Sequence, residues 1–313
     1  MKVLVTGGTG TVGHHLVRQL LRDPGVESIR VLGRSEYRIL QFKQAFPGED
    51  KLDVVSGDVS DRRAMAWSCA GMDTVFHLAA MKHVDLIEKD PHLAMLTNIE
   101  GTQTTVDAAL GAGVGRFVLM STDKVVHASS LYGATKLVSE KIVLAANRVR
   151  PIFNVFRSGN VLNSSGSVFE VWRRQIARDN TMAVTDPTMT RFFMRKGALA
   201  KALAGMPKVA PNVVYVPRND ALRLRDLVVL MRERYGDAKT KTTVIGRRPG
   251  EKQHEELISV EELARTRTAV DHYLVGPSAL TKPLDRVPIS ARFVLPKTKL
   301  RAILDQELAG DDA

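Results

Sequence analysis

The most informative chemistry in the sequence lies between Thr122 and Lys136. Tyr132 and Lys136 are four residues apart, and on a helix this spacing puts both side chains on one face. A free phenol titrates near pH ~10, so a neighbouring ammonium group helps a tyrosine to act as a base by stabilising its phenolate. Together with Thr122 at the end of a predicted strand, they predict proton abstraction from a sugar hydroxyl group. The alternative is a surface tyrosine and lysine on an amphipathic helix.

Asp123 and Lys124 follow Thr122 directly and add two more groups that can transfer protons. Oxidation of an alcohol needs only the Thr/Tyr/Lys set, so the additional groups favour an elimination. In a sugar oxidised at carbon 4, the proton on carbon 5 is acidic. A lysine amine can remove that proton, while a carboxylic acid protonates the hydroxyl that leaves carbon 6. The pair therefore predicts a 4,6-dehydration, unless it is only a solvated ion pair in a loop.

A glycine-rich segment near the N-terminus can hold the oxidising cofactor. A predicted strand over 2–6 leads into Gly7-Gly8-Thr9-Gly10-Thr11-Val12-Gly13, and an amphipathic helix follows at once. Small residues in such a turn let the backbone approach a pyrophosphate, and the free N–H groups of the helix N-terminus hold its negative charge. We therefore predict dinucleotide contacts from Gly7, Thr9, Gly10, Thr11, Val12 and Gly13.

The choice between NAD and NADP depends on the end of the second predicted strand, which reads Leu32-Gly33-Arg34-Ser35. It has no carboxylate for the 2′-hydroxyl of NAD, whereas Arg34 can pair with a 2′-phosphate. We therefore predict NADP, with NAD as the alternative cofactor. Arg34 could also be a solvated surface residue that does not contact the cofactor. The positions that follow later strands extend the predicted cofactor contacts, which then also include Ser35, Asp58, Val59, Leu78, Ala79 and Ala80.

The elements that must position these residues follow an α/β order. Amphipathic stretches, the longest over 93–112 and 131–147, alternate with short apolar runs, which indicates a doubly wound parallel (Rossmann) sheet. The predicted strands are 2–6, 28–32, 51–56, 74–78, 116–120 and 152–157. We expect His77 to pack within its strand.

Beyond residue 157 the pattern is less regular and predicts a smaller C-terminal α+β substrate lobe. Helices are expected over 167–179, 195–206 and 221–235, with short strands at 213–216 and 242–245. We place an NADP-binding domain at 1–160, to which these two strands can return, and the lobe at 161–313. The tail from Lys297 predicts a last helix with a frayed end at Asp311 and Asp312.

Composition excludes several classes of protein. The chain has 313 residues with 44% hydrophobic and 25% charged, which is typical of packed globular proteins. It shows neither a signal peptide nor an apolar run of the ~18–20 residues that span a bilayer, so we expect a cytoplasmic protein without a membrane partner. The single cysteine, Cys69, predicts a packed residue and no disulfide, and the absence of Cys/His spacing predicts no metal site.

The formal net charge of +11 permits anionic partners. Arg173-Arg174 and Arg247-Arg248 could form a nucleic-acid patch, but no recognised module accompanies them, and aromatics at 5% leave few stacking surfaces. We therefore predict no nucleic-acid partner. His14 and His15 are expected to face solvent or the neighbouring helix, and both Trp67 and Trp172 are expected to pack inside the protein.

Taken in order over about the first 260 residues, the motifs resemble a known family. This family is the soluble nucleotide-sugar 4,6-dehydratases related to the inverting UDP-N-acetylglucosamine 4,6-dehydratase, within the extended short-chain dehydrogenases. The motifs that carry the resemblance are Gly7–Gly13, Gly57-Asp58-Val59, Ala79-Ala80-Met81-Lys82-His83-Val84, Asn98, Ser121-Thr122-Asp123-Lys124, Leu131–Lys136, Gly159-Asn160-Val161, Met189-Thr190-Arg191-Phe192 and Arg248-Pro249-Gly250-Glu251-Lys252.

The resemblance implies an NADP-bound homo-oligomer that acts on UDP-N-acetylglucosamine, with Thr122, Asp123, Lys124, Tyr132 and Lys136 as its catalytic residues. It also implies cofactor contacts from Lys82 and Asn98. The substrate contacts that it implies are Lys82, His83, Asn160, Arg191, Arg248 and Glu251. Guanidinium groups suit a diphosphate, and Asn160 and Glu251 can hydrogen-bond sugar or uridine groups.

Two departures from the family pattern leave alternatives open. His127-Ala128 stands where relatives usually carry Asn-Pro, and Thr188 stands where they often carry arginine. The expected product has an inverted carbon 5. Retention at carbon 5, a 5,6-dehydration or a 4-epimerisation are the alternatives on the same fold. A non-catalytic NADP-binding regulator is the alternative of another class, against which Tyr132 and Lys136 argue.

Overall fold

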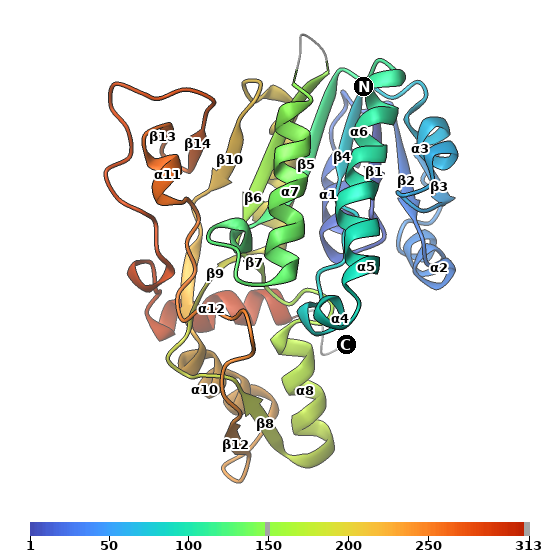
Figure 1. The fold of residues 1–313 in the computed structure, drawn as a ribbon. Helices are drawn as coiled ribbons and strands as arrows, with labels where there is room; N and C mark the ends of the chain where they lie inside the picture. Colours follow the sequence, from blue (N-terminus) through green and yellow to red (C-terminus); the bar gives the residue numbers. More distant parts are fainter. Residues whose placement is uncertain (148–150, 310–313) are drawn as a thin grey trace.

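The computed structural model describes residues 1–147 and 151–309, and among these residues a nine-stranded sheet forms the centre of the fold (Figure 1). Its strand order is β13-β14-β10-β6-β5-β4-β1-β2-β3. The six predicted strands are confirmed and run parallel to one another, as in a doubly wound Rossmann sheet. Their bounds are β1 Lys2–Thr6, β2 Ser28–Gly33, β3 Leu52–Ser56, β4 Thr74–His77, β5 Arg116–Thr122 and β6 Ile152–Ser158.

Three further strands from the second half of the chain complete the sheet. β10 (Val214–Pro217) runs parallel to β6, as the run at 213–216 predicted. The strands β14 (His272–Val275) and β13 (Thr266–Thr268) then add antiparallel at the edge. The prediction that 242–245 can return to this sheet is wrong. β12 (Lys241–Val244) instead pairs with β8 (Thr181–Val184) in a separate two-stranded sheet.

Helices cover both faces of the large sheet, and each face has its own apolar core. Buried residues of α3, α6 and α7 pack against one face, and buried residues of α1, α2 and α9 pack against the other (Figure 1). Cys69 is fully buried in the first core, as predicted. The bounds are α1 Thr11–Leu21, α2 Glu36–Ala45, α3 Arg62–Cys69, α6 Gly101–Gly111, α7 Leu131–Ala145 and α9 Lys196–Ala204.

The substrate lobe has a third apolar core, which includes the fully buried Trp172. Its strands β7 (Asn160–Val161), β9 (Thr190–Met194) and β11 (Asp220–Arg223) form a three-stranded sheet. The predicted helix over 221–235 begins only at Leu224, because the residues before it pair with β9. The lobe helices are α8 Val168–Asp179, α10 Leu224–Tyr235 and α12 Lys297–Leu308, and the predicted acidic end at 311–312 lies outside the described residues.

Two expectations about local structure need correction. Trp67 is 56% exposed and does not pack inside; its ring instead lies 4.2 Å from the Arg30 guanidinium carbon. The predicted helix over 93–112 is divided into α5 (Pro91–Ala94), a π-helix over Met95–Glu100 and α6. A π-helical turn adds a residue per turn and is common at functional sites. Two further short helices are α4 (Val84–Lys89) and α11 (Val260–Leu263).

One buried ionic network joins the sheet to the C-terminal half of the chain. Arg157 of β6 is 2% exposed and donates hydrogen bonds to Glu140 of α7 and Glu262 of α11, with the shortest N–O distance to each at 2.7 Å. Glu140 also accepts a 2.6 Å bond from the Ser121 hydroxyl. The two carboxylates hold the pKa of Arg157 above its usual range although burial lowers it, so the guanidinium is charged at every pH at which the protein is folded.

We expect Arg157→Met to destabilise the protein by about 3–5 kcal/mol, because removal of the cation leaves two buried carboxylates without their partner. The free energy of unfolding in urea, measured near pH 7, checks this value. Arg286→Met is the matched control, because Arg286 is 73% exposed in its contact with Asp285, and exposed pairs contribute at most about 1 kcal/mol. Equal losses in the two variants would contradict a structural role for the Arg157 network.

Candidate active site

The carboxyl ends of β1 and β4 meet at the glycine-rich turn. Gly7 has φ +65°, and a Cβ atom added to it would lie 2.7 Å from the backbone of Ala79, after β4. A Cβ on Gly13 would lie 2.2 Å from the carbonyl oxygen of Gly8. The turn therefore requires glycine at both positions, and it leads directly into α1, whose first residue is Thr11. This is the local geometry that a pyrophosphate group needs.

The predicted adenine side of this turn contains an ion pair that the sequence pattern did not indicate. The Arg34 guanidinium lies 3.2 Å from Asp58, and both residues follow neighbouring strands. Burial raises the pKa of Asp58, but hydrogen bonds from Ser60 and Arg34 lower it by more. Arg34 is still well exposed, whereas Val59 is buried in the first apolar core. Ser35 caps α2 by accepting a hydrogen bond from the backbone N–H of Arg38.

His77 and Asn98 hold the segment that follows β4. His77 is fully buried between the hydroxyls of Thr6, at 2.8 Å, and Thr102, at 3.2 Å. Burial lowers the pKa of His77 to about 3, so it is a neutral packed residue, as predicted. Asn98 of the π-helix donates hydrogen bonds to the Met81 carbonyl and the Thr135 hydroxyl. It thereby connects the region of Ala79 and Ala80 to helix α7, which carries Tyr132 and Lys136.

The start of the lobe lies across the glycine-rich turn. The backbone N–H of Ser165 donates to the Thr11 hydroxyl at 3.1 Å, and the two hydroxyls lie 2.9 Å apart. Lys82 donates to the Ser165 carbonyl at 2.7 Å. A cavity of about 310 Å³ opens beside these residues, and its lining includes Thr9 and Arg38. Thr9 and Thr11 therefore line one space next to the glycine-rich turn, and Lys82 contacts Ser165 of the same lining.

Four predicted site residues meet at the end of β5. Asp123 is fully buried; its Oδ1 atom lies 3.0 Å from the Lys124 Nζ and accepts a 3.1 Å bond from the Thr122 hydroxyl. The Lys124 Nζ also donates to Asn160 Oδ1 at 3.2 Å. The Oδ2 atom of Asp123 is buried without a hydrogen-bond partner. The structure therefore brings an amine, a carboxylic group and a hydroxyl together in one partly enclosed site.

Tyr132 and Lys136 lie on α7 beside this group, as their spacing predicted. Burial raises the pKa of Tyr132, and the charge of Asp123 raises it further, while Lys124 and Thr122 lower it without reversing the shift. Lys124 is thus a cation that acts on the phenol and that the spacing did not suggest. Lys136 is 3% exposed, and burial lowers its pKa to about 8 against the opposing charge of Glu140.

The residues predicted to bind substrate occupy two places. Asn160 and Arg191 lie with the catalytic group, and the Arg191 guanidinium donates to the carbonyls of Thr190 and Gln253. Arg248 and Glu251 lie in the segment after β12, where a hydrogen bond joins the Arg248 backbone N–H to Glu251. Arg248 also lies 3.4 Å from Asp85 of α4, and about half of its side chain is exposed. His83 is the N-cap residue of the same helix α4.

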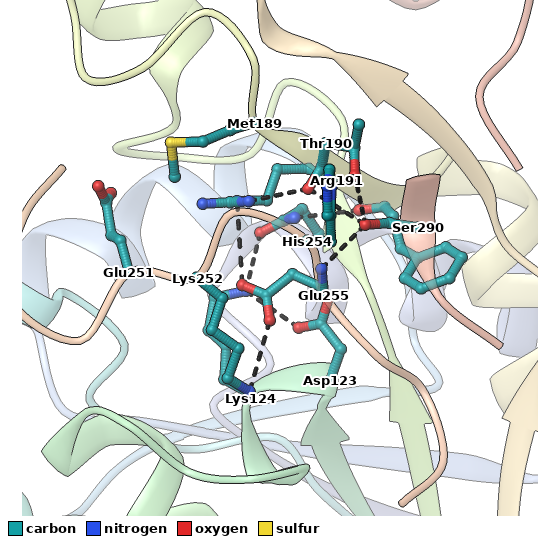
Figure 2. A network of polar contacts seen from close by, with 12 residues as sticks. Asp123, Lys124, Met189, Thr190, Arg191, Glu251, Lys252, His254, Glu255 and Ser290 are labelled. Atoms are coloured by element: carbon teal, nitrogen blue, oxygen red, sulfur yellow. Dashed lines mark hydrogen bonds and ion pairs between the residues drawn. The ribbon is translucent and has the colours of Figure 1, made fainter. Parts of the chain in front are cut away.

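The sequence reasoning missed a buried carboxylate at the centre of this arrangement. Glu255 is 3% exposed, and it faces Arg191 and Lys252 in the polar network of Figure 2, above Asp123 and Lys124. Burial raises the pKa of Glu255, as does Asp123, whereas Lys124, Arg191 and Lys252 oppose the shift. The sequence offered one indication of Glu255, namely that it lies three residues after the Arg248–Lys252 motif. This indication does not distinguish Glu255 from Glu256.

A search of known protein families matches residues 3–277 to the model of the polysaccharide biosynthesis protein family. That range includes the glycine-rich turn, the catalytic group and the Arg248–Lys252 segment. The chain belongs to this family. No helix in the two described stretches is long and apolar enough to cross a membrane.

Individual relatives include two kinds of nucleotide-sugar enzyme. The chain is 31% identical to a UDP-N-acetylglucosamine 4,6-dehydratase (inverting) of Campylobacter jejuni over 88% of this chain and 83% of the relative. It is also 31% identical to a UDP-glucose 4-epimerase of Rickettsia massiliae, over 87% and 82%. The relatives of this chain thus include both a dehydratase and an epimerase.

Solved structures confirm the fold of the family member. Pen from Bacillus thuringiensis has a TM-score of 0.92 at 30% identity and covers 98% of each chain. A dTDP-glucose 4,6-dehydratase of Streptomyces venezuelae, with NAD bound, has a TM-score of 0.75 at 25% identity over 81% of this chain and 87% of that one. The Rossmann arrangement of the large sheet is therefore shared with nucleotide-sugar enzymes.

We expect Gly13→Ala to weaken dinucleotide binding at least tenfold, because the added methyl group would displace the Gly8 carbonyl from the turn. Titration calorimetry with NADP and NAD checks this. Gly111→Ala is the control: Gly111 ends α6 and has no atom within 4 Å of an added Cβ, so cofactor affinity is expected to stay constant. Unchanged affinity in Gly13→Ala would place the cofactor elsewhere.

Proposed function

We propose that this family member is an NADP-dependent UDP-N-acetylglucosamine 4,6-dehydratase that inverts carbon 5. The observation that carries this proposal is the Lys124 amine 3.0 Å from the buried Asp123 carboxylate, at the strand end beside Tyr132. An oxidation alone needs neither group, whereas removal of water from a 4-keto sugar needs a base and an acid close together. The similarity to an inverting dehydratase over most of both chains supports the same reaction.

In the first step, the Tyr132 phenolate takes the proton of the carbon-4 hydroxyl. A nicotinamide cofactor held at the glycine-rich turn would supply the redox chemistry of the reaction, the transfer of a hydride from carbon 4 and its return to carbon 6. Since burial raises the pKa of Tyr132, this step depends on cations that stabilise the phenolate. Lys124 lowers that pKa directly, while Lys136 and Thr122 are the remaining members of the proposed set.

In the second step, a proton passes from the Lys124 ammonium to the Asp123 carboxylate across their 3.0 Å contact. The Lys124 amine then removes the proton from carbon 5, and the Asp123 carboxylic acid donates its proton to the hydroxyl that leaves carbon 6. One water molecule is lost, and a carbon 5–carbon 6 double bond forms. Return of the hydride to carbon 6 and of a proton to carbon 5 completes a 4-keto-6-deoxy sugar. Asn160 accepts a hydrogen bond from Lys124 and so fixes the direction of the amine, which decides the face on which carbon 5 is protonated.

A 4-epimerase is the second candidate, favoured by the 31% identity to a UDP-glucose 4-epimerase. An epimerase oxidises carbon 4 and returns the hydride to the same carbon, so it has no use for a base at carbon 5. The buried Asp123–Lys124 pair is therefore the feature that favours dehydration. Retention at carbon 5 is an alternative outcome of the same chemistry. A homo-oligomeric state and a cytoplasmic location stay predictions.

The proposed preference for NADP rests on cations next to the glycine-rich turn. Arg34 follows β2, where NAD enzymes place a carboxylate, and Arg38 lines the cavity that contains Thr9 and Thr11. Asp58 occupies part of the hydrogen-bonding capacity of Arg34, which makes Arg38 a second ligand for a 2′-phosphate. The Streptomyces venezuelae structure holds NAD, so the preference requires its own test.

We expect Lys124→Met and Asp123→Asn to lower the dehydration rate about 10²–10⁴-fold, the usual loss for a general base or acid. NMR of the protein with UDP-N-acetylglucosamine in D2O follows the reaction through deuterium at carbon 5 and the new methyl group at carbon 6. Lys208→Met, in the turn after α9, should keep the wild-type rate. Undiminished dehydration in Lys124→Met would exclude Lys124 as the base, and a carbon-4 epimer as the product would establish the second candidate.

For the cofactor, we expect Arg34→Ala to lower the affinity for NADP about tenfold and to leave that for NAD nearly unchanged, because the lost charge-assisted bond is made only to the 2′-phosphate. Fluorescence titration with each cofactor gives the ratio of the affinities for NADP and NAD. Arg38→Ala tests the second cation in the same way. Arg22→Ala, at the opposite end of α1, is the charge-matched control. Parallel losses for NADP and NAD in Arg34→Ala would argue against recognition of the 2′-phosphate.

A further inference from the structure

Glu255 is a buried carboxylate whose side chain the proposed mechanism has not used. Its Oε1 atom lies 3.9 Å from Arg191 Nε and its Oε2 atom lies 3.8 Å from Lys252 Nζ. Both distances are longer than hydrogen bonds, and the buried Oε2 atom has no hydrogen-bond partner. A buried carboxylate that is stabilised by charge but left without a close partner is costly for the fold, which suggests that it serves the site.

The backbone of Glu255 is held by two hydrogen bonds to Ser290. Its N–H donates to the Ser290 hydroxyl at 2.9 Å, and its carbonyl accepts the Ser290 N–H at 2.8 Å. The Ser290 hydroxyl lies 2.6 Å from that of Thr190, which in turn lies 2.8 Å from the His254 ring. Figure 2 shows this chain of contacts on the side of Glu255 away from Lys124. The carboxylate therefore has a defined place next to the site.

The electrostatic surroundings of Lys124 come from several elements. Asp123 and Glu255 carry negative charge, Arg191 of β9 carries positive charge, and all three act on the Lys124 amine. Tyr132 of α7 also interacts with it, and Lys252 acts on Glu255. Burial lowers the pKa of Lys124, but the two carboxylates raise it by more, with the result that it lies above the usual value. Glu255 is the negative charge that reaches Lys124 from outside the Asp123–Lys124 pair.

We propose that Glu255 is a positioning residue for Lys124, whose fixed negative charge strengthens the amine as a base toward carbon 5 of the substrate. This inference rests on the proposed function in naming carbon 5, but the effect of Glu255 on the Lys124 amine is independent of the substrate. When Lys124 accepts the proton, a carbon–hydrogen bond breaks, its electron pair stays on the sugar, and an ammonium forms. The Glu255 carboxylate stabilises that ammonium without taking part in the bond changes.

Removal of the Glu255 charge has a defined sign. In Glu255→Gln the Lys124 ammonium loses one of its two stabilising carboxylates, so its pKa falls. At a given pH more of the amine is then neutral, but each amine is a weaker base. The acid-side limb of the pH profile for proton removal at carbon 5 therefore moves to lower pH, by about one unit for the loss of one neighbouring opposite charge. The maximal rate falls at the same time.

The direct test is the titration of Lys124 by NMR of protein labelled with 13C at the lysine Cε atoms, with NADP present. Lys124→Arg identifies its resonance. We expect Glu255→Gln to lower the titration midpoint of Lys124 by about one pH unit. Glu256→Gln is the matched control, because this neighbouring glutamate faces His127 at 3.4 Å, and its midpoint shift should be near zero. An unchanged Lys124 midpoint in Glu255→Gln would overturn the inference.

Two further measurements separate this inference from its assumptions. If Glu255→Gln does not fold, Glu255→Asp serves instead, because it keeps the charge but moves it away by one methylene. We then expect a smaller decrease in the Lys124 titration midpoint. An unchanged midpoint would contradict the inference. Deuterium exchange at carbon 5 of UDP-N-acetylglucosamine, measured against pH, should move with the NMR midpoint. If the wild-type protein converts no UDP-sugar, the proposed function fails, whereas the NMR result still decides the role of Glu255.

Discussion

The position of Arg157 between two buried carboxylates is the constraint on which the site depends. Glu140 belongs to α7, which carries Tyr132 and Lys136, and Glu262 begins the C-terminal part of the chain that returns to the sheet. Each of these three buried charges would lower the stability of the fold if it were unpaired. They pair with one another only when β6, α7 and α11 are packed together. The catalytic helix and the segment that brings Glu255 into the site are therefore fixed by the same interaction.

A second constraint comes from the order of the chain. β7 and β9 are parallel neighbours in the lobe sheet, so Asn160 and Arg191 lie on adjacent strands although 30 residues separate them. The Thr190 N–H donates to the Gln253 carbonyl, and Ser290 then holds Glu255. The site is consequently complete only when the late part of the chain is docked, although the groups proposed for chemistry come from β5, from the turn over Asp123–Val125 that follows it, and from α7.

The sequence was most informative where local rules decide the structure. The strand–glycine turn–helix at Lys2–Leu21 follows from backbone sterics, and the Tyr132–Lys136 spacing follows from helical geometry, so both were predictable. β12 has the composition of any exposed edge strand, and nothing local states whether its partner is β8 or the large sheet. Trp67 is exposed because stacking on Arg30 replaces packing in the core. Glu255 could not be separated from Glu256 by residue type, because only the docking of distant elements buries Glu255 fully and leaves Glu256 partly exposed.

The two lysines of the site show how the arrangement assigns roles. Asp123 and Glu255 together outweigh burial and the charge of Arg191 at Lys124, and its pKa lies above the usual value. Lys136 is buried near Glu140, but the Arg157 guanidinium already binds that carboxylate through two nitrogens, and the pKa of Lys136 falls to about 8. The same residue type is thereby held as a strong base at one position and as a readily deprotonated group at the other. When two residues of the same type have different surroundings, their pKa values differ, and this difference commonly decides which one acts as an acid and which as a base. Arg157 thus contributes to that division by occupying Glu140, in addition to holding the fold together.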